Sequence, residues 1–532
     1  MADTFSAPTR KALPLILVRG FGGLDVEDEK RIAYQGFNDG TVYPQKLGEN
    51  YIYEGFILRF LKSSWHYQDA TNVVGYYPNK MEHERTELPP EVAQLDKSFF
   101  SGDKVVVDPA MAAHLLRNTQ EPCRTLWVFR YYDLNDRNFD MYGMALVRLI
   151  DFIRALAVEQ TGEKPKVNII AHSMGGLLVR EAIQVSYPGT GRRADDHINK
   201  IVTLGTPHQG ISFQFLQNWI HIEAEKELEH FNPKFQENAK KPASFKNFGK
   251  HFPLERLLTI VGTNYRSYDV GIASKLNRLA SVAGEFGPNY NRSDGLVKQT
   301  LAQIPGAPRT FVHKCHGGFD SLVTARESYE IATRFFFGNV RARLRLVQGK
   351  IKRGKDLFGK SEFFFGVSIK PRRVDFDLFH QSPEAENCYG PFGKEDLSDK
   401  DIAFPWAGEG RLIWEGYLDT SSILEDKSIT VKDMVLRLDL YLGERDLFGI
   451  GFSDNVIFRK QYYVRTLLQK PFTLYSYADE QFARPGFVSQ PANEMRKVDG
   501  GWEFDVGGTG FDGTFRVEID NVPEVGEPLP FK

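Results

Sequence analysis

The stretch Val167-Asn-Ile-Ile-Ala-His-Ser-Met-Gly-Gly176 decides how this chain folds. An apolar run leads through a turn of small residues into the helix-like segment Leu177-Leu-Val-Arg-Glu-Ala-Ile183. A sharp strand-to-helix turn exposes its serine hydroxyl and needs small residues on either side, because other chain segments pass close by. Ala171 and Gly175 fill those two positions. We therefore predict that Ser173 is a nucleophile held on this turn, and not a serine that merely occupies a buried turn.

Two backbone amides are candidates for binding the oxyanion that forms when such a serine attacks a carbonyl. The amide of Met174 lies at the predicted helix start, where the partial positive charge of the helix end favours an anion. The amide of Phe21 is the second, in the glycine-rich loop Val18-Arg-Gly-Phe-Gly-Gly23. Glycine-rich turns also cradle phosphates, but this loop lacks the Lys-Ser/Thr ending and the dinucleotide glycine spacing. We therefore assign it to the oxyanion.

The acid that orients the base should follow the nucleophile in the chain and stand after a strand. Asp294, in Arg292-Ser-Asp-Gly-Leu-Val297, follows the apolar run Leu257–Val261 and precedes a glycine that suits a tight turn. Asp269 and Glu285 lie in the same interval without that turn context. A lone acidic turn residue would be read as solvated, so the assignment of Asp294 depends on the whole constellation.

Two histidines lie in the segment Phe311-Val-His-Lys-Cys-His-Gly-Gly-Phe-Asp320. His313 still belongs to an apolar run, whereas His316 falls in the glycine-flanked loop after it, from which a histidine can reach the serine. We predict His316 as the general base and His313 as a packed or supporting residue. His172 should point away from the serine and be structural. A thiol nucleophile at Cys315 is disfavoured because its position offers no sharp turn.

Around these residues the chain alternates short apolar runs with amphipathic stretches, which is typical of a mostly parallel sheet covered by helices on both faces. The expected helix Tyr142–Ala157 has apolar residues at helical spacing and should end at Gly162. The expected strands are Leu13–Val18, Thr125–Phe129, Val167–Ala171, Ile201–Leu204, Leu257–Val261 and Thr310–His313. An α/β fold is therefore predicted up to about Gly338.

Beyond Gly338 the pattern changes to alternation of apolar and polar residues at period two, with Gly, Asp and Pro clusters between the runs. This pattern predicts an antiparallel β-sandwich for the last part of the chain. Its expected strands are Arg341–Val347, Phe363–Ile369, Arg411–Leu418, Val435–Leu442, Val456–Leu468, Trp502–Val506 and Thr514–Ile519.

Length and composition limit the function classes. A chain of 532 residues exceeds one ordinary core, so two domains are expected. The 67 basic and 69 acidic residues nearly cancel, which argues against nucleic acid or general adhesion to an anionic membrane as the partner. Three scattered cysteines fit a reducing compartment. Without a signal peptide or an apolar run of spanning length, we expect a cytoplasmic protein, with signal-independent secretion left open.

These residues together resemble the lipase and esterase branch of the α/β-hydrolase superfamily, especially lipases with an Ala-His-Ser-Met-Gly elbow. Three further stretches carry the resemblance: Thr203-Leu-Gly-Thr-Pro-His-Gln-Gly210, the acid turn Ser293–Val297 and His316-Gly-Gly318. The resemblance implies an α/β-hydrolase catalytic domain at residues 1–338, followed by a β-sandwich-like accessory domain at 339–532. Arg19 departs from the pattern, because the family's oxyanion loop usually begins with His; since the donor is a backbone amide, function should survive.

Two stretches inserted into the predicted α/β fold each allow two interpretations. The aromatic-rich stretch at about 34–116 either walls an acyl pocket or adds to the core. The stretch at about 211–252 is either a mobile cap, as such lipases often have, or a packed surface helix. No cofactor and no metal are expected. Some related lipases carry calcium near the histidine loop, to which Asp320 could contribute, but one carboxylate does not make a site. The aromatic residues of the first insertion include Tyr51, Tyr53, Phe56, Phe60, Trp65 and Tyr67.

The resemblance implies a serine hydrolase that cleaves carboxylic esters of lipids or other acyl compounds through an acyl-enzyme, with transient contact to lipid surfaces. A thioesterase or acyltransferase would use the same three residues, and the sequence does not separate these activities. A non-catalytic lipid- or protein-binding module is the rival from another class. Against that rival, a competent residue fills each position of the predicted triad.

Overall fold

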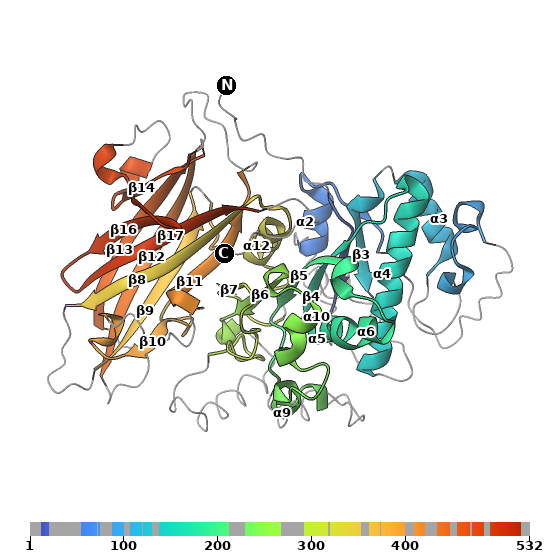
Figure 1. Ribbon diagram of the computed structural model, residues 1–532, viewed down its shortest axis with the longest axis horizontal. Coiled ribbons are helices and arrows are strands. Elements are labelled where there is room, and N and C mark those ends of the chain that lie inside the picture. Colours follow the sequence, from blue (N-terminus) through green and yellow to red (C-terminus); the bar gives the residue numbers. More distant parts are fainter. Residues whose placement is uncertain are drawn as a thin grey trace, which may run out of the picture.

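A computed structural model describes most of the chain. The described residues are 12–20, 55–71, 73–74, 88–100, 107–119, 121–129, 138–211, 229–267, 292–317, 320–352, 361–372, 374–398, 409–420, 433–446, 455–468, 471–483 and 490–522. Figure 1 shows two regions side by side, an α/β region and a region built of β-strands. Between them, helix α12 ends at Phe337 and strand β8 begins at Val340.

In the first region, the described residues form a seven-stranded sheet in the order β2-β3-β1-β4-β5-β6-β7, with parallel pairing between neighbours. The strands are almost wholly buried, as expected for parallel strands covered on both faces. The predicted fold class is confirmed, and six predicted strands match to within three residues; the two-residue β2 was missed. The strands are β1 (Leu15–Val18), β2 (Gln68–Asp69), β3 (Thr125–Phe129), β4 (Val167–His172), β5 (Ile198–Leu204), β6 (Leu257–Gly262) and β7 (Arg309–Val312).

The predicted helix Tyr142–Ala157 is confirmed as the central part of α4, the longest helix of the described chain. Its first turn is capped by the Asn138 side chain, which accepts a hydrogen bond from the Met141 amide at 2.7 Å. It ends at Gly162, whose φ of +70° is the left-handed conformation that stops a helix. The α-helices are α2 (Phe56–Lys62), α3 (Pro109–Asn118), α4 (Phe139–Thr161), α5 (Met174–Glu181), α6 (Tyr187–Gly189), α9 (Pro233–Glu237), α10 (Phe248–His251) and α12 (Arg326–Phe337).

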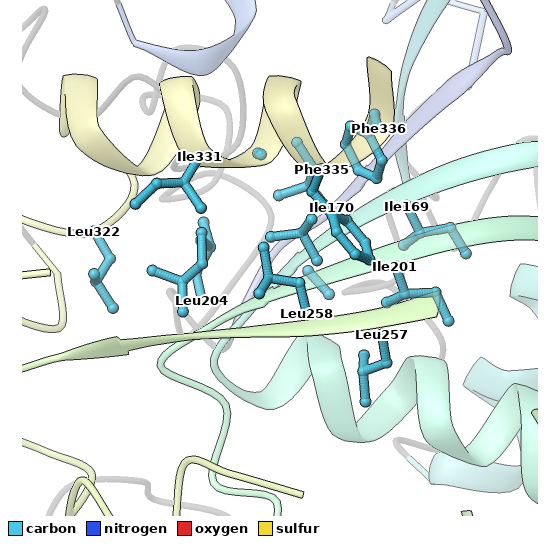
Figure 2. Packing of buried hydrophobic residues seen from close by; sticks show 14 of the residues in the cluster. Ile169, Ile170, Ile201, Leu204, Leu257, Leu258, Leu322, Ile331, Phe335 and Phe336 are labelled. Carbon is cyan, nitrogen blue, oxygen red and sulfur yellow. The ribbon is translucent and has the colours of Figure 1, made fainter. Parts of the chain in front are cut away.

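Helix α12 covers one face of the parallel sheet. Figure 2 shows its apolar side chains directed at those of β4, β5 and β6, with all labelled residues buried. Burying one such side chain contributes about 1.5–3 kcal/mol, so this layer holds the strands that carry the site firmly in register. The labelled residues are Ile169, Ile170, Ile201, Leu204, Leu257, Leu258, Leu322, Ile331, Phe335 and Phe336.

Aromatic residues at the start of the described part of the first insertion belong to the core beside α12. Phe60 lies edge-on to Tyr329 with ring centroids 4.9 Å apart, and Trp65 stacks on Phe337 at 3.8 Å. Tyr67 donates a hydrogen bond to the Leu13 carbonyl at 2.8 Å. For these residues the structure favours the interpretation that they add to the core over the interpretation that they wall an acyl pocket. Two others, Tyr51 and Tyr53, lie outside the described residues.

In the second region, the described strands form two five-stranded antiparallel sheets, in the orders β10-β9-β12-β13-β14 and β11-β8-β17-β16-β15. The predicted sandwich is confirmed, and the seven predicted strands are all present; β10, β14 and β15 were missed. The strands are β8 (Val340–Ile351), β9 (Ser361–Pro371), β10 (Tyr389–Phe392), β11 (Leu412–Leu418), β12 (Asp433–Asp446), β13 (Asn455–Leu467), β14 (Thr473–Tyr477), β15 (Arg496–Val498), β16 (Gly501–Gly507) and β17 (Phe511–Asn521).

Aromatic rings join the two sheets of the sandwich. Phe365 on β9 lies 5.8 Å and 6.0 Å from Phe511 and Phe515 on β17, and Tyr462 on β13 lies 6.2 Å from Phe504 on β16. On β16 and β17 such rings alternate with less buried polar residues, as the period-two pattern requires. These rings belong to the same continuous hydrophobic core as the layer beneath α12.

The two regions meet at β7, the edge strand of the parallel sheet. The amide of His380 donates to the Phe311 carbonyl at 3.0 Å, and the Thr310 hydroxyl donates to the Leu378 carbonyl at 2.5 Å. The rings of Phe311 and Phe379 lie 5.5 Å apart. The segment 378–380 thereby covers a sheet edge that would otherwise expose unpaired backbone groups.

Candidate active site

The strand order places the candidate residues at one end of the parallel sheet. From β1 the chain proceeds to β3 on one side and then returns to β4 on the other, and such a reversal leaves a crevice at the carboxyl ends of the strands. Gly20 follows β1, Ser173 follows β4, and His316 follows β7. Residues far apart in sequence therefore meet at the carboxyl end of the parallel sheet.

Ser173 forms the junction between β4 and α5 in a strained backbone conformation. Its φ of +53° and ψ of −127° are rare for a residue with a side chain and cost on the order of 1–3 kcal/mol. The turn is held by the Ser173 amide, which donates to the Leu204 carbonyl at 2.9 Å. A Cβ on Gly175 would lie 2.5 Å from the Arg19 carbonyl oxygen, so this position excludes any side chain. The predicted sharp turn is therefore present.

The structure brings the three predicted triad residues into one hydrogen-bonded row. The Nε2 atom of His316 lies 2.8 Å from the Ser173 hydroxyl oxygen, and its Nδ1 atom lies 2.8 Å from Oδ2 of Asp294. All three side chains are buried, with Asp294 only 1% exposed. In this order the carboxylate accepts from Nδ1, which leaves Nε2 free to accept the serine proton.

Asp294 is held by its own turn, as its glycine neighbour suggested. Its Oδ1 atom accepts from the amides of Leu296 at 3.0 Å and Val297 at 2.7 Å, while its carbonyl accepts from the His316 amide at 2.8 Å. Gly205, with φ of +55°, gives the carboxylate room, because a Cβ there would lie 2.8 Å from Oδ2. The two carboxylate oxygens thus have separate tasks, one structural and one directed at His316. The rival acids Asp269 and Glu285 lie outside the described residues.

The other nucleophile and base candidates have different surroundings. His313 contacts the Thr263 hydroxyl at 3.1 Å and stacks on His380, and burial lowers the pKa of its imidazole to about 4. The Cys315 thiol donates to the carbonyls of Gly317 and Asp320, and burial raises its pKa to about 12. The imidazole therefore stays neutral at pH 7, and the thiol stays protonated.

The two predicted oxyanion donors lie in the turn after β4 and in the loop after β1. The amide of Met174 opens α5, where first-turn amides have no partner within the helix and can bind an anion. Phe21 lies outside the described residues, but its neighbour Gly20 packs on the elbow: a Cβ there would lie 2.7 Å from Cβ of Ser173. The glycine loop after β1 therefore begins directly beside the nucleophile.

A buried arginine that sequence reasoning missed ties the elbow helix to the segment 229–252. Arg180, on α5, donates to the carbonyls of His208 and Ala243 and to the Gln184 side chain. Burial lowers the pKa of Arg180 to about 9. Two of its three acceptors are backbone carbonyls distant in sequence, and no residue type in the sequence identifies such acceptors.

Gln184 extends this connection and bears on the predicted cap at 211–252. Its side-chain amide donates to the carbonyls of Pro242 at 2.9 Å and Ser244 at 2.8 Å. Buried hydrogen bonds of this kind are costly to break, so the described part of the predicted cap is a fixed component of the α/β region. Residues 212–228 lie outside the described part.

The described chain offers neither a cluster of metal ligands nor a helix that could span a membrane. Within it, no three His, Cys, Asp or Glu side chains are grouped so as to hold a metal ion. Asp320, the calcium candidate, pairs instead with the Lys314 ammonium at 2.6 Å. No helix among the described residues combines the length and the apolar character needed to cross a membrane.

Residues 112–282 match the family model of the PGAP1-like alpha/beta domain, which includes Ser173 and ends before Asp294 and His316. No curated protein matches the chain. Among solved structures, lipase BlEst2 of Bacillus licheniformis in its propeptide form is 11% identical, with 90% of this chain and 98% of that chain covered and a TM-score of 0.30. Phospholipase PlaB of Legionella pneumophila is 12% identical, with coverage of 59% and 78% and a TM-score of 0.27.

These structural likenesses are too weak to carry an argument about activity, so the strand order, the elbow and the family match define the class. The chain has an α/β-hydrolase fold, followed by an additional C-terminal β-region. The resemblance to this superfamily is therefore confirmed, and the fold supports ester hydrolysis in general.

Proposed function

We propose that this protein is a serine hydrolase that cleaves carboxylic esters, of lipids or other acyl compounds, through an acyl-enzyme. The observation that carries the proposal is the row of two 2.8 Å contacts from Asp294 through His316 to Ser173, placed on a strained strand-to-helix turn. Nucleophile, base and orienting acid within hydrogen-bond reach are the arrangement that activates a serine.

The proposed reaction proceeds in two halves. His316 Nε2 takes the Ser173 proton as the hydroxyl oxygen attacks the ester carbonyl, and the resulting oxyanion accepts from the amides of Met174 and Phe21. His316 then gives its proton to the departing alcohol, which leaves an acyl group on Ser173. A water molecule, deprotonated by His316, attacks this acyl-enzyme and releases the carboxylic acid.

The first test compares the native chain with Ser173→Ala on p-nitrophenyl esters from acetate to palmitate. We expect kcat/KM to fall at least ~10³-fold in the variant, because the attacking atom is lost. Ser186→Ala is a matched control, since Ser186 is also buried in the helical stretch after the elbow and its hydroxyl has no hydrogen-bond partner in the described chain. Equal activity of Ser173→Ala and native protein would remove Ser173 from the mechanism.

Labelling with a fluorophosphonate separates the enzyme from a binding module on the same fold. An activated serine should take one probe per chain in the native protein and none in Ser173→Ala. A native chain that neither takes the probe nor hydrolyses any ester of the series would refute the proposed activity. Labelling without hydrolysis would point to transfer of the acyl group to another acceptor and refute the hydrolase assignment.

A further inference from the structure

His172, the last residue of β4, lies between two loops of the candidate site. Its Nε2 atom hydrogen-bonds the main-chain carbonyl oxygen of His316 at 2.8 Å, and the two imidazole rings lie 4.9 Å apart at 42°. On its other edge, a Cβ built on Gly20 would lie 3.2 Å from Nδ1. The ring therefore contacts both the loop that carries the base and the glycine loop after β1. The sequence predicts a structural residue whose side chain points away from Ser173.

This contact completes the anchoring of the His316 main chain. The His316 amide donates to the Asp294 carbonyl at 2.8 Å, and its carbonyl accepts from His172. The side-chain contacts of His316 with Ser173 and Asp294 depend on where this backbone is placed. A displacement of about 1 Å in such a site costs on the order of 10²-fold in rate.

We infer that His172 is a positioning residue, which holds the base loop in place through the hydrogen bond from its Nε2 to the His316 carbonyl. The inference rests on the proposed function for its effect on rate. It assigns to the residue before the nucleophile a task that differs from attack, proton transfer and oxyanion binding.

The charge of the ring agrees with this task. The acceptor is a carbonyl, so Nε2 carries the proton. Burial, and next the neighbouring His316, lower the pKa of His172 well below its ordinary value, and Arg19 acts in the same direction. The imidazole of His172 is therefore neutral at pH 7. A second cation would oppose the imidazolium that His316 becomes during catalysis.

The test compares His172→Gln with His172→Asn. A glutamine amide can present its nitrogen where the imidazole Nε2 stood, whereas an asparagine amide is one carbon too short. Both replacements are polar and neutral, so they differ mainly in reach. We expect His172→Gln to keep kcat within about threefold of native and His172→Asn to lose about 10- to 100-fold, with KM within about twofold in both. The pH profile of His172→Gln should superimpose on that of the native chain.

Two results would overturn the inference. One is a His172→Asn chain as active as native; the other is a His172→Gln chain as impaired as His172→Asn. A limb missing from the pH profile of His172→Gln would also contradict it, because His172 would then titrate as a catalytic group. The rate of fluorophosphonate labelling should follow the same ranking as kcat.

A readout without substrate separates this inference from the proposed function. The His316 Nδ1 proton, shared with Asp294, should give a strongly downfield proton resonance in magnetic resonance spectra. It should persist in His172→Gln and broaden through exchange in His172→Asn. If the native chain fails every ester and the probe, the proposed function is wrong, while the two resonances still decide whether His172 holds His316. Equal resonances in both variants would refute that hold.

Discussion

Asp294 in the α/β region and Asp433 in the sandwich are both buried carboxylates, but they have different partners. Asp294 accepts a hydrogen bond from an imidazole whose other nitrogen faces the Ser173 hydroxyl, and its second oxygen is held by two amides. Asp433 faces two arginines. Arg465, on the neighbouring strand β13, lies at 2.7 Å, and Arg372, directly after the neighbouring strand β9, lies at 2.8 Å. One carboxylate serves a site at a strand end, and the other joins strands within a sheet.

The same contrast extends to the surroundings of the two residues. Polar side chains of the α/β region converge beyond the carboxyl ends of the strands, whereas charged residues of the sandwich pair across adjacent strands, as Arg345 does with Glu518 and Arg343 with Asp520. Cross-strand pairs fix register and contribute modestly to stability. Burial of a charged side chain therefore does not by itself identify a functional site. The partners of that side chain, and whether its hydrogen bonds lead to a reactive group, identify it.

The largest effect is expected from Asp294→Asn. The amide removes the charge that stabilises the His316 imidazolium and no longer fixes the tautomer, and a change of this kind costs about 10⁴-fold in kcat. The shape is preserved, so the midpoint of thermal unfolding should stay within a few degrees. Steady-state hydrolysis and a thermal scan measure both. Activity within tenfold of native would remove Asp294 from the triad.

Asp433→Asn should give the reverse pattern. Removing one partner of a buried ion pair leaves two cations without their carboxylate, which costs about 3–5 kcal/mol of unfolding free energy. The ion pairs of Asp433 are with arginines of the sandwich and not with residues of the candidate active site. The kcat per folded molecule should therefore be unchanged. Urea unfolding and active-site titration provide the two numbers. A fall in kcat without loss of stability would show that the comparison between the two carboxylates is wrong.

Gly175→Ala tests the α/β region at its tightest point. The added methyl group would lie 2.5 Å from the Arg19 carbonyl and 2.6 Å from that of Val18, and overpacking of this kind costs about 1–3 kcal/mol. Displacing the loop after β1 should also lower kcat by about 10²-fold. Gly189→Ala, where the new Cβ meets nothing within 4 Å, is the control. Native activity in Gly175→Ala would mean that the glycine loop does not contribute to the oxyanion site.

The sequence predicted the parts of the molecule whose physical causes are local. Buried parallel strands appear in the sequence as apolar runs. The α4 helix has apolar residues at helical spacing and a glycine at its end. The strand-to-helix turn at Ser173 needs small residues at fixed positions around it. Ser173, Asp294 and His316 each lie beside a glycine or a turn that accounts for their geometry, so they could be found one at a time. The very short strands β2 and β15 carry too few residues for a pattern.

Contacts to distant backbone groups could not be predicted. The acceptors of Arg180 and His172 are carbonyl oxygens, which every residue possesses, so no residue type marks them. The cover that segment 378–380 gives to strand β7 likewise depends on how two regions pack together. These interactions follow from the fold and become visible only with it.

The smallest effect is expected at the junction of the two regions, where His313 of the α/β region stacks on His380 of the sandwich, with ring centroids 5.2 Å apart. Burial first, and His380 second, lower the pKa of His313 to about 4, against about 6.5 in an unfolded chain. Between these values the unfolded state binds more protons. The unfolding free energy is therefore highest above pH 6.5 and falls as the pH drops towards 4.

We expect this group to account for about 2 kcal/mol of the stability lost between pH 7.5 and 4.5, less than the full shift implies because His313 is partly exposed. Its contact with Thr263 is made through Nδ1, so His313→Asn keeps a polar atom there while removing the titration. Urea unfolding at the two pH values should show a smaller loss in this variant than in the native chain, and the same loss as native in His114→Asn, an exposed histidine on α3. Equal losses in all three chains would mean that acid weakens the protein elsewhere, and the contact between the regions would then be no more sensitive to pH than either region alone.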